Sequence, residues 1–185
     1  MQAIDALLRR RSARLLAAPA PDAAAIELIL ESAMRAPDHG GLRPWRFTVI
    51  QGEGLMRLGE LFAESVRRHR DPITPEELER ARRKALRAPL VIAVAAVIQT
   101  AVRIPAIEQI LSAGAAAQNM LLAAFVLGYN AVWKTGAPAY DDEVKAAFGL
   151  APKDAIVGFL YVGSEECAPK PGPRPAVREF TQIWQ

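Results

Sequence analysis

Apolar residues recur every three or four positions over several stretches of the chain, which is the spacing that builds one face of an α-helix. The first stretch covers 4–11, and the second begins after Asp22, a good N-cap residue, and runs to about Arg35. Thr74 opens a capping-box pattern with proline at the first helical position, which predicts another helix start. The predicted helices are 4–11, 22–35, 53–66, 74–88, 105–127 and a short one ending at Gly149 that Asp141 or Asp142 caps.

Four shorter runs are apolar and rich in β-branched residues, which is typical of strands. The run 90–98 is almost unbroken, so it predicts a strand that is covered on both faces. Two prolines and a glycine pair exclude a helix from 36–47, and this segment is predicted to be a loop that leads into the first strand. The predicted strands are 46–51, 90–98, 130–136 and 155–163.

The helix expected over 105–127 is apolar on nearly every side from Leu111 onward, and Gly128 stands where a left-handed C-cap is expected. A helix that is apolar all round is buried all round. We therefore expect this helix to be the central core helix or to lie in a dimer interface.

Residues 164–185 contain four prolines and are predicted to form an extended arm. The arm ends in Phe180, Ile183 and Trp184, which need a surface to dock on. The chain has no internal repeat and no change of composition that would mark a second domain. We expect 1–185 to form a single domain.

The composition of the 185-residue chain, 51% hydrophobic and 23% charged, suits one packed core. No apolar run approaches the roughly 20 residues of a membrane span, and the N-terminal charges follow the apolar residues, the reverse of a secretory signal. We expect a cytoplasmic protein with no membrane partner. The single cysteine, Cys167, and the two histidines exclude a disulfide framework and leave too few ligands for a structural zinc site.

Arginines cluster at 9–11 and at 80–83, although the net charge is only +3. No aromatic residues alternate with these arginines, which disfavours a nucleic-acid partner. The chain also lacks a Gly-x-Gly-x-x-Gly motif, a P-loop and a Gly-x-Ser-x-Gly elbow, and Cys167 lies in a proline-rich tail. Nucleotide-fold motifs and covalent hydrolase motifs therefore do not apply.

The segment Arg10, Arg11, Ser12 and Arg14 combines guanidiniums, which bind phosphate oxygens in a fork, with a hydroxyl that can donate to the same group. On spacing alone a solvated, basic helix end is the favoured reading, because charge runs are usually surface. The loop 36–47 gathers an imidazole, a carboxylate, two guanidiniums and an indole, and loops on rigid elements often carry binding groups.

Three motifs together resemble the short FMN-dependent nitroreductase subgroup. They are Arg-Arg-Ser at 10–12, Arg-Ala-Pro-Asp-His at 35–39 with Pro-Trp-Arg-Phe at 44–47, and Trp-Lys-Thr-Gly at 133–136. The resemblance spans 5–163. It implies an α+β fold with a mostly antiparallel sheet wrapped by helices, and a homodimer with two shared flavin sites. It also implies ping-pong chemistry, in which NAD(P)H reduces FMN and a nitroaromatic, quinone or similar small-molecule acceptor then reoxidises it.

The resemblance also implies a set of cofactor-binding residues. Arg10, Arg11 and Ser12 match the phosphate and ribityl contacts, and Arg14 matches a cation near the flavin pyrimidine, where it would stabilise the charge of the reduced ring. Two further sets of residues match family contacts. Arg35 and His39 match positions that reach the flavin from the other subunit. The residues that match the strand end lining the cofactor are Trp133, Lys134 and Thr135.

Several alternatives remain open at this stage. His39 without its flanking motif would be a surface or capping residue, and Trp45 and Phe47 are better read as core anchors than as ring-stacking partners. No catalytic acid, base or metal is assigned, although His39 could donate a proton to a reduced nitro oxygen. A flavin-binding protein without physiological turnover would carry the same motifs. Arg43 replaces a glutamine common in relatives, and Lys134 replaces an arginine.

Overall fold

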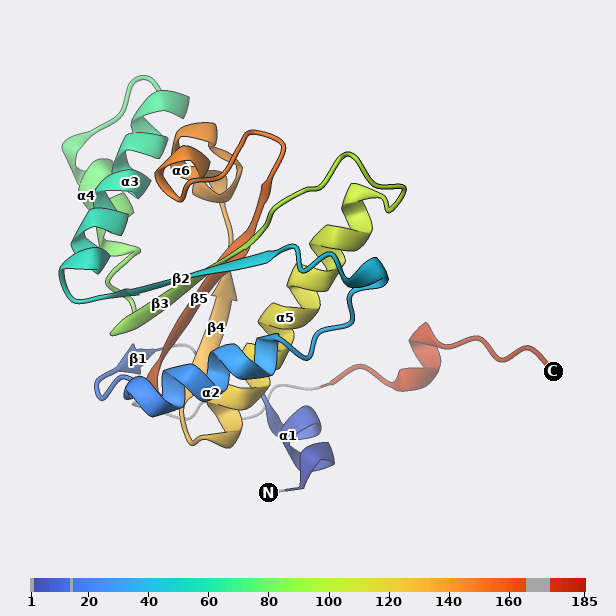
Figure 1. Cartoon of the computed structure of the whole chain (residues 1–185). Coiled ribbons are helices and arrows are strands. Elements are labelled where there is room, and N and C mark those ends of the chain that lie inside the picture. The colour runs from blue at the N-terminus through green and yellow to red at the C-terminus, as the bar shows by residue number, and fades with distance from the viewer. Residues whose placement is uncertain (1, 14, 166–173) are drawn as a thin grey trace.

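A five-stranded sheet forms the centre of the computed structural model, which describes residues 2–13, 15–165 and 174–185 (Figure 1). Its strands pair in the order β1-β5-β3-β2, with β4 also pairing with β5, and all of these ladders are antiparallel. The sheet class expected from the resemblance is confirmed. The strands are β1 (Leu16–Ala17), β2 (Trp45–Gln51), β3 (Leu90–Ala96), β4 (Asn130–Lys134) and β5 (Ala155–Glu165).

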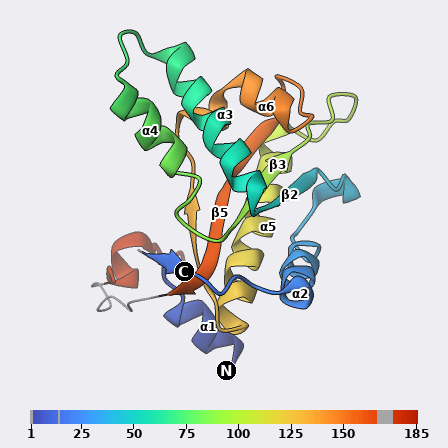
Figure 2. The same cartoon turned by 90° about the vertical axis from the view of Figure 1, so that its left-hand side faces the viewer.

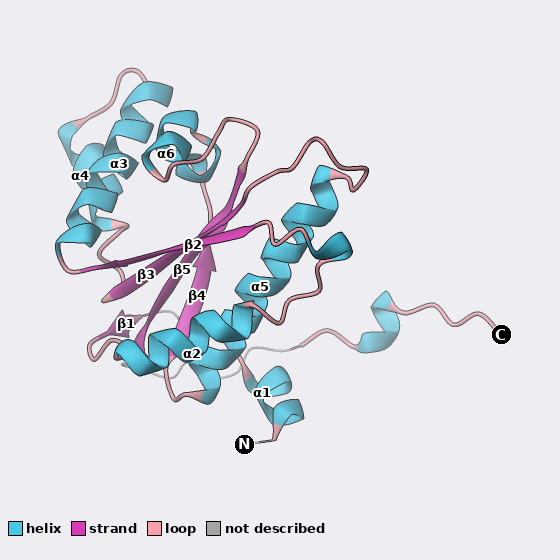
Figure 3. Cartoon of the chain, in the orientation of Figure 1, coloured by secondary structure: helices cyan, strands magenta, loops and turns pink. Residues whose placement is uncertain are grey.

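Helices cover both faces of this sheet (Figures 2 and 3). On β3, Ile92 and Val94 pack in one apolar cluster with α2 and α5, while Val91 and Ala93 pack in the other with α3 and α6. This alternation confirms that β3 is covered on both sides. The helices are α1 (Ala3–Arg9), α2 (Ala23–Ala33), α3 (Glu53–His69), α4 (Pro75–Arg83), α5 (Ala106–Val126) and α6 (Asp142–Ala147).

The predicted helix ends are largely confirmed by their capping contacts. The Asp22 carboxylate accepts from Ala25 N, and Thr74 completes a full capping box. Of the two candidates for the last helix, Asp141 is the cap, accepting from the backbone N–H groups of its first turn. Gly128 has φ of 89°, as a left-handed C-cap requires.

Several boundaries differ from the prediction: α4 ends at Arg83 rather than just before Pro89, and two other differences follow from contacts with residues distant in sequence. α1 ends at Arg9 rather than near Arg11, since the following residues run beside β4. β5 continues to Glu165, where it pairs with the unpredicted strand β1, so residues 164 and 165 belong to the sheet rather than to the predicted arm. The loop after α2 also contains a short 3-10 turn, His39–Gly41.

The long helix α5 lies against the sheet and α2, and its buried side is built largely of small residues. Its length and hydropathy would suit a membrane span, but the packing is that of a core helix. The expectation that it is buried all round is wrong for the single chain, because Ile107 and Leu111 are 58% and 63% exposed. The outer side of α5 is therefore an uncovered apolar strip.

Candidate functional site

The segment after α1 is held beside β4 and the end of β5. Ser12 forms a parallel bridge with Ala131, and Ala13 N donates to Ala131 O at 3.1 Å. Arg11 donates from both terminal guanidinium nitrogens to the two oxygens of Glu165, each at 2.6 Å. The segment is thus fixed by its backbone on one strand and by a side chain on another.

Arg10 lies next to a second guanidinium that comes from the C-terminal arm. Arg174 donates to the Arg10 carbonyl oxygen at 3.2 Å. Burial, and then the charge of Arg174, lower the pKa of Arg10. Within the described residues, neither of these guanidiniums forms an ion pair with a carboxylate, whereas Arg11 does. Two adjacent cations without a counterion form a candidate anion site, close to the exposed hydroxyl of Ser12.

Sequence reasoning missed Arg174, which belongs to this pair. It lies 164 positions from Arg10. Its own surroundings, a run of prolines and glycine, indicate only an extended tail. Nothing in the sequence predicts that the tail returns to the N-terminal segment.

The end of β4 lies on the same side of the molecule as this segment. Trp133 donates its indole N–H to Val157 O at 3.1 Å, and its ring lies so close over Gly158 that no side chain fits there. Lys134 is partly buried and Thr135 is exposed. Since Lys134 is three residues from Ala131, the partner of Ser12, only about 10 Å of strand separates the two groups.

The loop after α2 is shaped by its own backbone. The Asp38 carboxylate accepts from Arg43 N at 2.7 Å, and Arg43 has φ of 50°, unusual for a residue other than glycine. Gly40 has φ of 71° and packs against Ile104, where a Cβ would overlap the isoleucine side chain. The loop is therefore held in one shape that projects from the molecule.

Two predicted site residues lie in this region. Arg35 directly follows the last turn of α2 and is exposed. His39 Nδ1 lies 2.6 Å from Glu108 Oε2 in the first turn of α5, and both side chains are largely exposed, 65% and 40%. His39 therefore presents the rest of its ring to solvent at the N-terminal end of α5.

The structure does not bring the two groups together in one chain. His39 pairs with Glu108 at the start of α5, whereas Ser12 pairs with Ala131, five residues after the end of α5. A helix of 21 residues is roughly 30 Å long at about 1.5 Å per residue. Arg10, Arg11 and Ser12 with the end of β4 thus form one group, and His39 belongs to a second, near the start of α5. Arg35 follows Ser32, whose carbonyl oxygen accepts from Asn119 Nδ2 in the C-terminal half of α5.

The remaining predictions have separate outcomes. Trp45 is buried and Phe47 packs partly buried against the same cluster, which confirms both as core anchors. Arg14 and Cys167 lie outside the described residues. Within the described part of the chain, no group of three His, Cys, Asp or Glu side chains could hold a metal ion.

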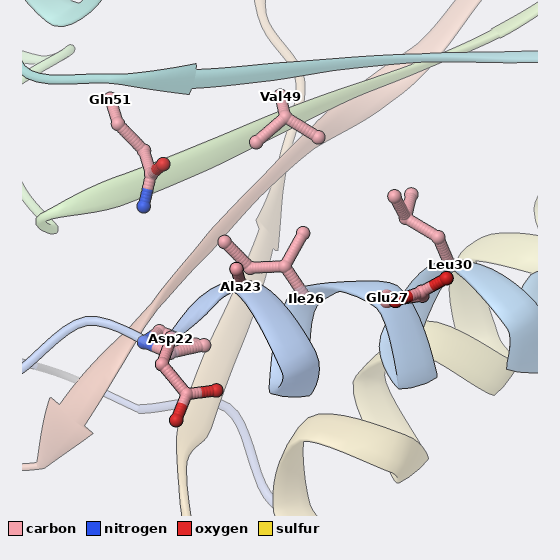
Figure 4. Close-up of a pocket in the computed structure, with 8 residues that line it drawn as sticks. Asp22, Ala23, Ile26, Glu27, Leu30, Val49 and Gln51 are labelled. Carbon is pink, nitrogen blue, oxygen red and sulfur yellow. The ribbon is translucent and has the colours of Figure 1, made fainter.

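A cavity of about 560 Å³ lies between the start of α2 and the free edge of β2 (Figure 4). Ile26 and Leu30 face Val49 and Gln51 across it, with Asp22 at one end. None of the predicted site residues lines this cavity. The charged side chains that line this cavity, Asp22 and Glu27, are carboxylates, which would repel an anionic ligand, whereas the segment after α1 offers cations.

Comparison with known proteins identifies the family. The family model described as "Nitroreductase family" matches residues 7–164. The chain is 38% identical to "Putative NAD(P)H nitroreductase YdjA" of Escherichia coli K12, over 97% of this chain and 100% of that protein.

Solved structures agree on the fold. The "Nitroreductase-like Family Protein from Bacillus cereus" superposes with a TM-score of 0.84 at 27% identity, over 100% of this chain and 97% of that one. A "putative nitroreductase in complex with fmn" from Desulfovibrio desulfuricans superposes with a TM-score of 0.74 at 24% identity, over 98% and 97% of the two chains. The chain belongs to the nitroreductase family.

Proposed function

We propose that the protein is an FMN-dependent NAD(P)H oxidoreductase of the cytoplasm that reduces nitroaromatic, quinone or similar acceptors. The observation that carries this proposal is the pair of adjacent guanidiniums, Arg10 and Arg174, with Ser12 two residues further along the chain from Arg10. Such a pair fits the phosphate group of FMN, because guanidiniums bind phosphate oxygens through charge-assisted hydrogen bonds. Two relatives point the same way: one is named for NAD(P)H and a fold neighbour is described in complex with FMN.

Some residues of such a site would bind the cofactor, and others would adjust the charge around its ring. Arg10, Arg174 and Ser12 would hold the phosphate end of the cofactor, and Lys134 would present a positive charge to the ring. When bound, FMN supplies the hydride and electron chemistry, accepting from NAD(P)H and passing electrons to the acceptor in a ping-pong order. Trp133 and Thr135 would line the cofactor at the end of β4, and the role expected for Arg14 stays a prediction.

We also propose that the site is completed by a second copy of the chain. His39 lies near the start of α5, so we expect it to join the Arg10 group only on another subunit, and the resemblance assigns Arg35 the same role. Apolar side chains exposed on α1 and α5 provide surface for such a dimer. They are Ile4, Leu7 and Leu8 on α1, and Ile107 and Leu111 on α5.

The visible spectrum and steady-state kinetics test the proposed activity. Purified protein should show the absorption of oxidised flavin, lose it on addition of NAD(P)H, and regain it with a quinone or nitroaromatic acceptor. A protein that binds FMN but turns over no acceptor would instead be a flavin-binding protein. A protein that binds no FMN would overturn the proposal altogether.

Mixed dimers test the shared site. Arg10→Ala and His39→Ala remove one residue from each of the two groups, so each homodimer has two damaged sites. In a mixed dimer, one site carries both changes and the other carries neither. We expect the mixture to regain FMN binding that neither parent has, whereas a site built within one chain would regain none.

A further inference from the structure

The Arg11 guanidinium forms a bidentate ion pair with a carboxylate of the same chain. Its two terminal nitrogens each donate to one oxygen of Glu165 at 2.6 Å, and the two side chains are only 24% and 11% exposed. The hydrogen bonds to Glu165 raise the pKa of Arg11. A guanidinium paired end-on in this bidentate way keeps only its side-on donors for a phosphate, and the carboxylate cancels its charge.

Glu165 also binds the strand that carries the site. Its Oε2 accepts from Asn130 Nδ2 at 2.9 Å, and Asn130 Oδ1 accepts from Ala131 N at 2.9 Å. One carboxylate therefore joins three parts of the chain that are far apart in sequence. These are the segment after α1, the start of β4 and the end of β5.

Among the described residues, few backbone contacts hold the segment in this position. α1 has already ended at Arg9, the Ser12 bridge with its Ala13 N to Ala131 O bond links the backbone to β4, and Arg174 donates to the Arg10 carbonyl oxygen. The chain is next paired at β1, which lies against the end of β5. Backbone that is tied by so few bonds opens easily unless side chains restrain it. The partly buried ion pair of Arg11 with Glu165 supplies this restraint.

We propose that Glu165 is a positioning residue for cofactor binding: together with Arg11 and Asn130 it holds Arg10 and Ser12 in place to receive an anionic phosphate. Arg11 then acts through Glu165 rather than by touching the phosphate, which revises the role that its motif suggests. This inference rests on the proposed function, because the phosphate is that of FMN.

The two possible roles of Arg11 predict opposite effects of removing the Glu165 charge. If Arg11 binds the phosphate, Glu165 competes with it, and Glu165→Gln should leave FMN binding unchanged or tighten it. If Glu165 positions the segment, the same change should weaken FMN binding. We expect the dissociation constant for FMN to rise about tenfold, in line with the coupling measured between residues of one network.

The test measures FMN binding by quenching of flavin fluorescence in the wild type, E165Q, R11K and the double variant. A shared role predicts that the double variant binds FMN about as weakly as either single variant. If the fold-increases in the dissociation constant for FMN of the two single variants multiply in the double variant, the inference is overturned. Glu60→Gln is the matched control, since it removes the same charge from an exposed ion pair with Arg82 on the other face of the sheet.

A second measurement does not require flavin. Hydrogen exchange of the Ala13 amide in apo protein should be faster in E165Q than in the wild type, and unchanged in E60Q. Glu165→Asp, which keeps the charge on a shorter side chain, should show an intermediate effect and replaces E165Q should that variant not fold. Unchanged Ala13 exchange would overturn the inference, because the segment would then be held without Glu165.

The outcomes separate this inference from the proposed function. A wild type that does not bind FMN overturns both. A wild type that binds FMN, with E165Q binding it equally well or more tightly, overturns only the positioning role of Glu165.

Discussion

The two groups of candidate site residues are held in contrasting ways. Arg10 and Ser12 lie on a segment tied to β4 and β5 through a partly buried carboxylate. His39 lies on a projecting loop whose only ion pair, among the described residues, is the exposed one with Glu108. The first group is held by partly buried contacts, whereas the second is exposed on a loop. Residues of one set of motifs therefore differ in how firmly the fold holds them.

The largest effect is expected for Arg10→Ala, which tests the group held within one chain. Loss of a charge-assisted contact costs about 1.5–3 kcal/mol, so FMN should bind about 10–100 times more weakly. Riboflavin, which lacks the phosphate, should bind the variant and the wild type equally well. Fluorescence titration with both ligands measures this difference.

The matched control is Arg80→Ala on α4, an exposed arginine of the second cluster on the other face of the sheet. It should leave binding of both ligands unchanged. If Arg10→Ala weakened riboflavin as much as FMN, Arg10 would not act on the phosphate.

Gly40→Ala tests whether the projecting loop depends on its backbone shape. The residue would need a strained positive φ and would overlap Ile104, so we expect a loss of about 1–3 kcal/mol of stability. Gly41→Ala is the control: its φ of 64° is similar, but no atom lies within 4 Å of the added Cβ. In thermal unfolding, Gly40→Ala should have a clearly lower melting temperature than Gly41→Ala. Equal losses of stability in the two variants would mean that contact with Ile104 is unimportant.

Asp141, remote from both groups, provides a reference for stability alone. Burial raises its pKa, but hydrogen bonds from Arg68 and from backbone N–H groups outweigh this and lower the pKa to about 2. Because the folded value lies below the ordinary 3.8, the carboxylate stabilises the fold above that pH, and the contribution is lost as the pH falls toward about 2.

Asp141→Asn should therefore cost about 1–2 kcal/mol at neutral pH and almost nothing near pH 2. Denaturant unfolding at the two pH values measures it. FMN binding by the folded variant should be unchanged, which would show that stability and cofactor binding are separable here.

The smallest effect is expected for Glu108→Gln. Exposed ion pairs contribute about 0.2–1 kcal/mol, so FMN binding should weaken at most a few-fold. High salt, which screens exposed charges, should reduce this effect further, while the E165Q effect should persist because its pair is partly buried. A larger loss for Glu108→Gln than for E165Q would reverse the contrast between the two groups.

Most of the fold could be predicted from local signals. Helix ends depend on contacts within a few residues, as at the capping box of Thr74, the cap of Asp22 and the C-terminal Gly128. The unbroken apolar sequence of β3 directly indicates that this strand is buried on both faces. What failed depends on distant partners. The end of α1 and the two-residue strand β1 are decided by pairing with β4 and β5, which no local pattern records.

The candidate site was predictable in its residue types but not in its contacts. The motif indicates that Arg11 belongs to the site, yet its partner Glu165 lies 154 positions away. Trp133 likewise donates its indole N–H to the carbonyl oxygen of Val157, a residue of another strand. Whether a polar group is free for a ligand depends on which neighbours the fold brings to it.

The backbone at Arg43 has a consequence for protein engineering. Its N–H is held by Asp38, and its carbonyl oxygen accepts from Arg46 at 3.1 Å, so the loop is shaped by groups other than the Arg43 side chain. A φ of 50° also suits asparagine or glycine. Replacing Arg43 with asparagine or glycine should therefore remove the guanidinium that the loop presents while its architecture is retained.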